Sequence, residues 1–292
     1  MFLILGCGYT GVRAARRLLA RGLPVIATTR QPGNLDLPGA RILRLDLAEP
    51  ATLDRLRDEL PSGLRVLHSI PLLRTPEGFA DPTPRLLDCL PGSTARVVYL
   101  STTGVYGATP EVDEATPAAP RTPRETLRVE AERHVLAGPW SALVLRPAAI
   151  YGPGRGVHVS MREGAFRLLG DGGNFVSRIH VDDLAALAEA ALFSELTGAW
   201  PVADLLPARS HDVAAWCAER LHLPMPPSAT PEELSETRRA NRRVDGRAVC
   251  VRLGISLRYP SYREGLTQAL REEGFAGSVL PSAEIGGKRS QD

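Results

Sequence analysis

The hydrophobic and polar positions of this chain alternate in blocks that fit strands and helices in turn. Residues 2–5, FLIL, are a short apolar run typical of a strand that is buried on both faces. Residues 10–21 repeat apolar side chains at helical spacing, with Val12 and Leu18 on one stripe, and Gly22 is placed to end this helix. The segment PVIATT that follows is a second apolar strand. The start of the chain therefore predicts a β-α-β unit.

The same alternation continues through the first half of the chain. The segments ARILRLDL, LRVLHSI and ARVVYLS have the composition of strands, while ATLDRLRDEL and a stretch near residues 83–90 have the pattern of helices. Strands separated by helices require crossover connections, and such connections make a sheet parallel. We predict an α/β fold, a Rossmann-type doubly wound parallel sheet with helices on both faces and a smaller C-terminal substrate lobe.

The regular alternation loosens into glycine-rich sequence after residue 151, and a helix of alanines and leucines restarts at 183. This pattern is expected of a chain that leaves the sheet, builds part of a second lobe and returns. The predicted division is a dinucleotide-binding Rossmann domain over 1–151 with 176–204 returning to it, a smaller lobe from 152–175 and 205–275, and a flexible tail over 276–292.

Composition and charge exclude several classes of protein. A net charge of +2, with no basic stripe interleaved with aromatic residues, gives no reason to expect a nucleic-acid partner. There is no apolar run long enough to span a membrane and no leader-like segment before the first strand, so we expect a cytoplasmic protein without a membrane partner. The four cysteines and six histidines lack the spacing of metal ligands, and no metal site is expected.

The segment GCGYTG places Gly6, Gly8 and Gly11 in the pattern G-x-G-x-x-G between the first strand and the first helix. In such a turn the first glycine permits the sharp bend, the second lets a pyrophosphate approach the backbone, and the third lets the helix pack close to the strand. The N–H groups at the start of the helix then face the phosphates. The turn predicts dinucleotide binding, and the alternative is a glycine-rich turn in an ordinary α/β protein.

The end of the second strand determines which dinucleotide is expected. An acidic residue about 20 positions after the turn would bind the ribose 2'-hydroxyl of NAD, but the sequence there is Thr28, Thr29, Arg30. Because Arg30 could pair with a 2'-phosphate, the segment favours NADP(H) over NAD(H), and the alternative is a solvated loop arginine. Asp46 is expected to contact the adenine, to cap the next helix, or both. The candidate cofactor-binding residues are Gly6, Gly8, Tyr9, Thr10, Gly11, Thr29, Arg30, Asp46, Leu47, Ser69 and Pro147.

Together with the glycine turn, the motifs STTGVYG, LRPAAIYGPG and RIHVDDLA give the chain a resemblance to a known family. It resembles the short-chain dehydrogenase/reductase superfamily, in particular its extended, NAD-dependent epimerase/dehydratase-like branch, from residue 2 to about 270. In that family a Ser or Thr after the fifth strand orients the substrate hydroxyl, and Thr102 matches this position. The Tyr of a YxxxK motif transfers a proton, and its Lys lowers the Tyr pKa and binds the nicotinamide ribose.

The chain departs from the family at the YxxxK motif. Aligning the family's AE with Ala131 and Glu132 puts Arg124 at the Tyr position and Arg128 at the Lys position, a departure similar to that of the atypical YeeZ-like members. No lysine replaces the missing one, because Lys288 is the only lysine of the chain. Arginine does not release a proton near neutrality, but it binds anions well. The alternative is a solvated helix on which both arginines pair with Glu125, Glu130 and Glu132.

The candidate catalytic residues that remain are Thr102, Tyr106 and Arg128. Tyr106 is the proton donor nearest in sequence, with a packing role as its alternative, and Arg128 could hold the ribose or a phosphate. Further along, Arg178 or His180 could lie near a substrate. Asp182 or Asp183 is expected to cap the returning helix, and Arg155 could face an anion.

Two hypotheses of different classes follow. The favoured one is an NADP(H)-dependent oxidoreductase or epimerase-like enzyme with an atypical active site, acting on a small polar or nucleotide-linked substrate. The other is a catalytically silent NADP(H)-binding redox sensor or complex partner. A small molecule of unknown identity is the expected partner, and a homodimer is possible by analogy with the family.

Overall fold

The computed structural model describes residues 1–275, and the tail predicted for 276–292 lies outside the described residues. The main sheet has seven strands in the order β14-β9-β7-β4-β1-β2-β3, and every neighbouring pair is parallel. The predicted fold class is therefore confirmed. The strand order reverses between β1 and β4, where such folds bind ligands. The strands are β1 (Phe2–Leu5), β2 (Val25–Thr29), β3 (Arg41–Arg44), β4 (Arg65–His68), β7 (Arg96–Leu100), β9 (Ser141–Pro147) and β14 (Gly198–Val202).

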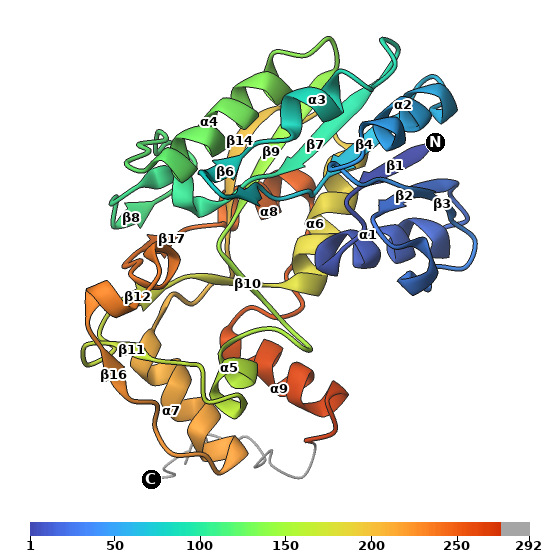
Figure 1. Cartoon of the computed structure of the whole chain (residues 1–292). Helices are drawn as coiled ribbons and strands as arrows, with labels where there is room; N and C mark the ends of the chain where they lie inside the picture. Colours follow the sequence, from blue (N-terminus) through green and yellow to red (C-terminus); the bar gives the residue numbers. More distant parts are fainter. Residues whose placement is uncertain (276–292) are drawn as a thin grey trace, which may run out of the picture.

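Helices cover both faces of this sheet (Figure 1). Successive strand residues point to opposite faces, so Ile4 packs in one core and Leu3 and Leu5 pack in the other. Because both faces are covered, the central strands are mostly apolar: β1 is FLIL and β2 is VIATT, and four of the five β2 residues are buried. One face carries α1 (Tyr9–Ala20), α6 (Val181–Phe193) and α8 (Arg247–Leu253), and the other carries α2 (Pro50–Glu59), α3 (Thr83–Leu87) and α4 (Pro123–Leu136).

A second group of helices lies beyond the carboxyl ends of the strands, at the bottom of Figure 1. These are α5 (Val157–Arg162), α7 (Ser210–Leu221) and α9 (Tyr262–Glu272), which share a separate core. The domain boundaries stay a prediction, and α8, which falls in the segment assigned to this lobe, packs instead with α6 in the core of the sheet. Among residues 1–275, no helix is both long and apolar enough to cross a membrane.

Short strands and turns complete the described chain. β10 (Ala149–Tyr151) pairs with β13 (Arg178–His180), and β8 (Glu111–Val112) pairs with β17 (Arg243–Val244). The others are β5 (Leu73–Thr75), β6 (Gly78–Ala80), β11 (Leu168–Leu169), β12 (Phe175–Val176), β15 (Ala208–Arg209) and β16 (Ser228–Ala229), with the 3₁₀ turns η1 (Pro32–Asn34), η2 (Thr103–Tyr106), η3 (Pro231–Glu233) and η4 (Glu236–Arg238).

A buried arginine ties the end of α6 to the sheet. Arg96 on β7 donates hydrogen bonds to the carbonyl oxygens of Ala191 and Leu196, both at 2.6 Å. It also donates to the hydroxyls of Ser141 at 2.5 Å and Ser194 at 3.1 Å. The last carbonyl groups of a helix have no partner within the helix, so this guanidinium satisfies groups that would otherwise be buried and unpaired.

We expect Arg96→Leu to lower the free energy of unfolding by about 3 kcal/mol or more, because each buried polar group left unpaired costs about 1–3 kcal/mol. Urea unfolding followed by circular dichroism measures the change. The matched control is Arg252→Leu, an exposed arginine on α8, which should change stability by no more than about 0.5 kcal/mol. Equal stability of the two variants would contradict the role given to Arg96.

Candidate functional site

The turn between β1 and α1 is built on close backbone contacts. Gly6 has φ +83°, and a Cβ on it would lie 2.6 Å from Cγ1 of Ile70. A Cβ on Gly11 would lie 2.5 Å from the carbonyl oxygen of Gly6. The Gly6 N–H donates to Oγ1 of Thr28 at 3.0 Å, and the Gly6 carbonyl accepts from Oγ of Ser69 at 2.6 Å. Two of the three motif glycines are therefore required by packing.

Gly8 is different, because a Cβ built on it would meet no atom within 4 Å. It is exposed and stands just before α1, which has no side-chain cap and no acidic residue in its first turn. The N–H groups of that turn are consequently free of side-chain acceptors among the described residues. An open backbone at a helix N-terminus is the arrangement that accommodates phosphate groups.

A cavity of about 390 Å³ lies beside Gly8, between the ends of β1 and β2. Arg13 and the exposed Arg30 both line it, and no residue that lines it is acidic within the part of the chain that the structure describes. The charge of Arg30 and the position of the cavity at the carboxyl ends of β1 and β2, next to the reversal of the strand order at β1, suit a dinucleotide phosphate. The lining residues are Cys7, Gly8, Tyr9, Val12, Arg13, Thr29, Arg30, Gln31, Asn34 and Leu35.

The remaining candidate cofactor residues lie at the carboxyl ends of three other strands. Asp46 and Leu47 follow β3, Ser69 follows β4, and Pro147 ends β9. Oδ1 of Asp46 accepts the N–H of Ala48 at 3.1 Å, whereas α2 begins after Glu49, so the expectation that Asp46 caps this helix is wrong. Contact of these residues with the cofactor stays a prediction.

The segment after β7 carries two of the candidate catalytic residues. Thr102 is half-buried and its Oγ1 accepts the N–H of Gly104 at 3.1 Å, which starts the turn η2. Tyr106 is completely buried, and its hydroxyl accepts a hydrogen bond from Nη1 of Arg146 at 3.2 Å. Burial raises the pKa of Tyr106, and Arg146 offsets part of that rise. The catalytic role of Tyr106 stays a prediction. Its hydroxyl contacts the ion pair that Arg146 forms with Glu132.

That ion pair is a buried network that the sequence did not reveal. Nη2 of Arg146 lies 2.6 Å from Oε2 of Glu132. Oε1 of Glu132 accepts from Nε of Arg146 at 3.1 Å and from Oγ of Ser101 at 2.5 Å. Glu132 is 2% exposed, so the alternative that placed it on a solvated face of α4 is wrong. The pair links α4 to β9 directly beneath η2.

A second arginine holds the same segment from the far end of the sequence. Arg242 is buried, and its guanidinium donates to the carbonyl oxygens of Thr109 at 3.0 Å, Thr103 at 2.6 Å and Gly107. The following residues form β17, which pairs with β8. Arg242 therefore fixes the conformation of the turn that carries Thr102 and Tyr106.

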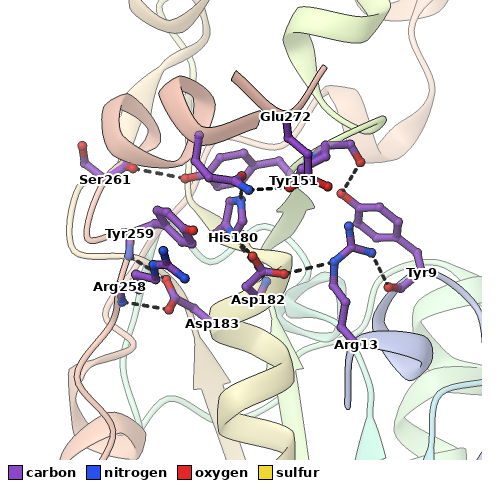
Figure 2. Close-up of polar contacts among 12 residues, drawn as sticks. Tyr9, Arg13, Tyr151, His180, Asp182, Asp183, Arg258, Tyr259, Ser261 and Glu272 are labelled. Atoms are coloured by element: carbon purple, nitrogen blue, oxygen red, sulfur yellow. Dashed lines mark hydrogen bonds and ion pairs between the residues drawn. The ribbon is translucent and has the colours of Figure 1, made fainter. Parts of the chain in front are cut away.

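The junction with the smaller lobe is a cluster of polar contacts, which Figure 2 shows. His180, and neither Asp182 nor Asp183, is the N-cap of α6: its Nδ1 accepts the N–H of Asp182 at 3.2 Å. Asp183 accepts the N–H groups of Arg258 at 2.8 Å and Tyr259 at 2.9 Å. His180 is buried against the Tyr259 ring, and burial lowers its pKa to about 4. It is neutral at pH 7, in a structural position.

Arg178 is also buried in this junction, where it donates to the Val176 carbonyl at 2.7 Å. Burial raises the pKa of the nearby Asp204 carboxyl to about 8, although Arg178 offsets part of the rise. Oδ2 of Asp204 is buried and has no hydrogen-bond partner among the described residues. The position of Arg178 or His180 near a substrate stays a prediction.

Residues 2–198 match the sequence model of the NAD dependent epimerase/dehydratase family. The chain belongs to this family. It is 28% identical over 303 residues to a Streptomyces protein named 3-diazoavenalumate denitrifying reductase, in an alignment that covers 90% of this chain and 98% of the relative. The predicted resemblance is confirmed at the level of the family, and the likeness to the YeeZ-like members stays a prediction.

Solved structures of similar fold include a functionally unknown conserved protein from Silicibacter pomeroyi. It is 33% identical, with a TM-score of 0.77 over 93% of this chain and 98% of that one. The UDP-glucose 4-epimerase of Thermus thermophilus, solved with NAD, is 21% identical, with a TM-score of 0.76 over 96% of this chain and 100% of that one. At that identity the second likeness shows the fold alone.

In this member of the epimerase/dehydratase family, α4 carries the two arginines where the tyrosine and lysine were expected. Nη1 of Arg128 donates to the hydroxyl of Tyr99, whose ring lies 4.8 Å from that of His68. The guanidinium of Arg124 lies 5.4 Å from the centre of the Phe79 ring. Neither arginine forms an ion pair with a carboxylate in the described residues, so the solvated, paired helix is not observed. A role for Arg128 with the ribose or a phosphate stays a prediction.

Substitutions at Gly8 and Gly11 distinguish the contribution of the glycine turn to dinucleotide binding from its contribution to packing. We expect Gly8→Ala to leave stability within about 0.5 kcal/mol of the wild type, because the position is open and has φ −93°. Its methyl group would stand where a pyrophosphate approaches, so dinucleotide affinity should fall about 10-fold or more. Gly11→Ala should instead lower stability by about 1–3 kcal/mol through the clash with Gly6. Urea unfolding and titration calorimetry with NAD+ and NADP+ measure both effects, and wild-type affinity in Gly8→Ala would contradict this assignment.

Proposed function

We propose that this protein is an NADP(H)-dependent reductase. The observation that carries the proposal is the position of Arg30, which lines the cavity beside Gly8 in company with Arg13 and without an acidic neighbour in the described lining. A guanidinium at the end of β2 can form charge-assisted, bidentate hydrogen bonds with a 2'-phosphate. A carboxylate there would bind the ribose hydroxyls of NAD instead. The Thermus relative was solved with NAD, so both dinucleotides belong in the test.

Arg30→Ala should weaken NADP+ binding about 10- to 100-fold, since a hydrogen bond to a charged group contributes about 1.5–3 kcal/mol. NAD+ affinity should stay within about 2-fold of the wild type, because NAD+ lacks the 2'-phosphate. Titration calorimetry with each dinucleotide gives the two affinities, and Arg252→Ala, which removes an exposed charge on α8, is the control. An Arg30→Ala protein that binds NADP+ as the wild type does would refute the preference.

The reaction is constrained by what α4 lacks. The family's tyrosine donates a proton to the substrate, and an arginine at its position cannot do so near neutral pH. Of the candidates that remain, Tyr106 has its hydroxyl turned toward Arg146, and burial raises its pKa. We therefore infer a reduction that needs a hydride at carbon and no proton from the protein. NADPH supplies that hydride when bound.

The name of the Streptomyces relative, a denitrifying reductase of 3-diazoavenalumate, supports the reductive direction and points to a suitable class of substrate. When a hydride adds to the carbon of an aryl diazonium group, a C–H bond forms, the C–N bond breaks, and its electron pair leaves with neutral dinitrogen. No atom is left needing a proton. A carbonyl group reduced in the same way would leave an alkoxide, which does need one. An aryl diazonium compound is accordingly the first substrate class proposed.

With a carboxylated benzenediazonium salt as probe, the wild type should oxidise NADPH and, with NADPH deuterated at the transferred position, place deuterium on the ring carbon. Tyr106→Phe should keep this rate within about 3-fold, whereas loss of a general acid would lower it about 10²- to 10⁴-fold. The Gly8→Ala protein, assayed at an NADPH concentration below its Kd, is the negative control, because it is expected to keep the fold and to bind the dinucleotide more weakly. A rate no higher than that control would exclude this substrate class, and a large loss in Tyr106→Phe would show that Tyr106 donates a proton.

The comparisons do not favour the second hypothesis, a protein without turnover. The match to the family covers α6 and every strand of the main sheet except β14, and the alignment with a named reductase covers nearly all of both chains. An enzyme with an altered proton-transfer site also accounts for Arg124 and Arg128 at the positions where the family has tyrosine and lysine.

A further inference from the structure

The loop Gly152–Gly156, GPGRG, connects β10 to α5 and lies directly against the phosphate-binding turn. The hydroxyl of Tyr9, the residue after Gly8, donates a hydrogen bond to the Pro153 carbonyl at 3.0 Å. A Cβ on Gly152 would lie 2.9 Å from the same hydroxyl. Burial raises the pKa of Tyr9 to about 12, so it remains a donor at neutral pH. The smaller lobe is thus attached to the first turn of α1, as the Tyr9 contact in Figure 2 shows.

The loop has a defined shape and a second attachment. Gly152 and Arg155 exchange backbone hydrogen bonds of 2.9 and 3.0 Å, and Gly154 has φ +74°, a conformation that favours glycine. On the far side, Oε1 of Glu273 accepts the N–H of Gly154 at 2.7 Å. The backbone of the loop is therefore held at both sides, and Arg155 is its one charged residue.

Arg155 lies over the ring of Tyr9, where a second guanidinium already lies. The guanidinium carbon of Arg155 is 5.5 Å from the ring centre and that of Arg13 is 4.3 Å from it. Arg13 forms an ion pair of 3.1 Å with Asp182. Arg155 is exposed and forms no ion pair with any carboxylate among residues 1–275. Two positive charges therefore gather at one ring, and only one of them is compensated there.

Like charges that gather at one point repel each other, and an anion between them removes this cost. The anion that this family brings to the turn is the pyrophosphate of a dinucleotide. Arg155 stands beside the residue that begins α1, next to the open Gly8. A guanidinium here would add a charge-assisted hydrogen bond to the backbone N–H groups of the turn.

We propose that Arg155 binds the pyrophosphate of the dinucleotide, so that the smaller lobe supplies part of the cofactor site and its loop closes over the phosphates. The inference uses the dinucleotide binding of the family and does not depend on the preference for NADP(H). It also gives the Tyr9–Pro153 hydrogen bond a function, because that bond holds the loop where Arg155 reaches the turn.

Titration calorimetry with three ligands separates Arg155 from Arg30. Arg155→Ala should weaken both NADP+ and NAD+ about 10-fold or more, the effect of losing a hydrogen bond to a charged group. It should leave the affinity for 2'-AMP, which has no pyrophosphate, unchanged. Arg30→Ala should show the opposite pattern, with weaker NADP+ and 2'-AMP and unchanged NAD+. Arg155→Lys should restore part of the affinity, because it keeps the charge and loses the bidentate geometry.

Thermal unfolding without ligand establishes that the variants fold, and Arg252→Ala controls for the loss of an exposed charge. Wild-type affinities of Arg155→Ala for both NAD+ and NADP+ would overturn the proposal, and so would an equal loss of 2'-AMP binding. If Arg30→Ala has no effect while Arg155→Ala weakens both dinucleotides, the NADP(H) preference fails and the role of Arg155 stands.

Discussion

The contact between the Gly11 position and the Gly6 carbonyl is the constraint on which this structure depends. A Cβ at position 11 would lie 2.5 Å from that oxygen, so α1 can pack against β1 only because glycine is present. This approach keeps the first turn of α1 at the reversal of the strand order, with Thr28 and Ser69 satisfying the polar groups of Gly6. Gly6 and Gly11 make the close contacts of the turn, whereas the backbone of Gly8 faces open space. The cavity lies beside this open position.

Several polar contacts fix how the smaller lobe meets the sheet. Asp183 holds the backbone of Arg258 and Tyr259, Arg242 holds three carbonyl groups around η2, and Tyr9 holds Pro153. Buried polar groups are costly when they are unpaired, so these contacts favour one relative placement of the segments that they join. The same contacts lie around the dinucleotide turn and the segment of Thr102. Binding at the turn and the position of the lobe are therefore expected to be coupled.

The sequence predicted those features that depend on local pattern. The strands β1 to β4 and β7 and the helix from Tyr9 follow from periodicity within short segments, and the glycine turn and Arg30 follow from motif spacing. The burial of Glu132 could not be predicted in this way, because the sequence around it is that of a charged surface helix and its partner Arg146 belongs to a strand. Arg242 and its carbonyl partners are more than 130 residues apart, and no local signal marks such a contact. The packing of α8 on the sheet was missed for the same reason.

The departures on α4 form a consistent physical picture. An arginine keeps its charge at every pH at which the protein is folded, so it can hold a partner and cannot relay a proton. Arg128 holds such a partner, since it donates a hydrogen bond to the hydroxyl of Tyr99. Burial lowers the pKa of His68, beside Tyr99, to about 3, which keeps the His68 ring neutral. Tyr106 is held between a buried ion pair and the turn of Thr102, in surroundings that oppose its ionisation. Around the predicted catalytic segment the fold thus retains positive charge and hydrogen-bond donors, while burial keeps Tyr106 and His68 in their neutral forms. Such surroundings suit the binding of an anion and the acceptance of a hydride better than reactions that exchange protons with the protein.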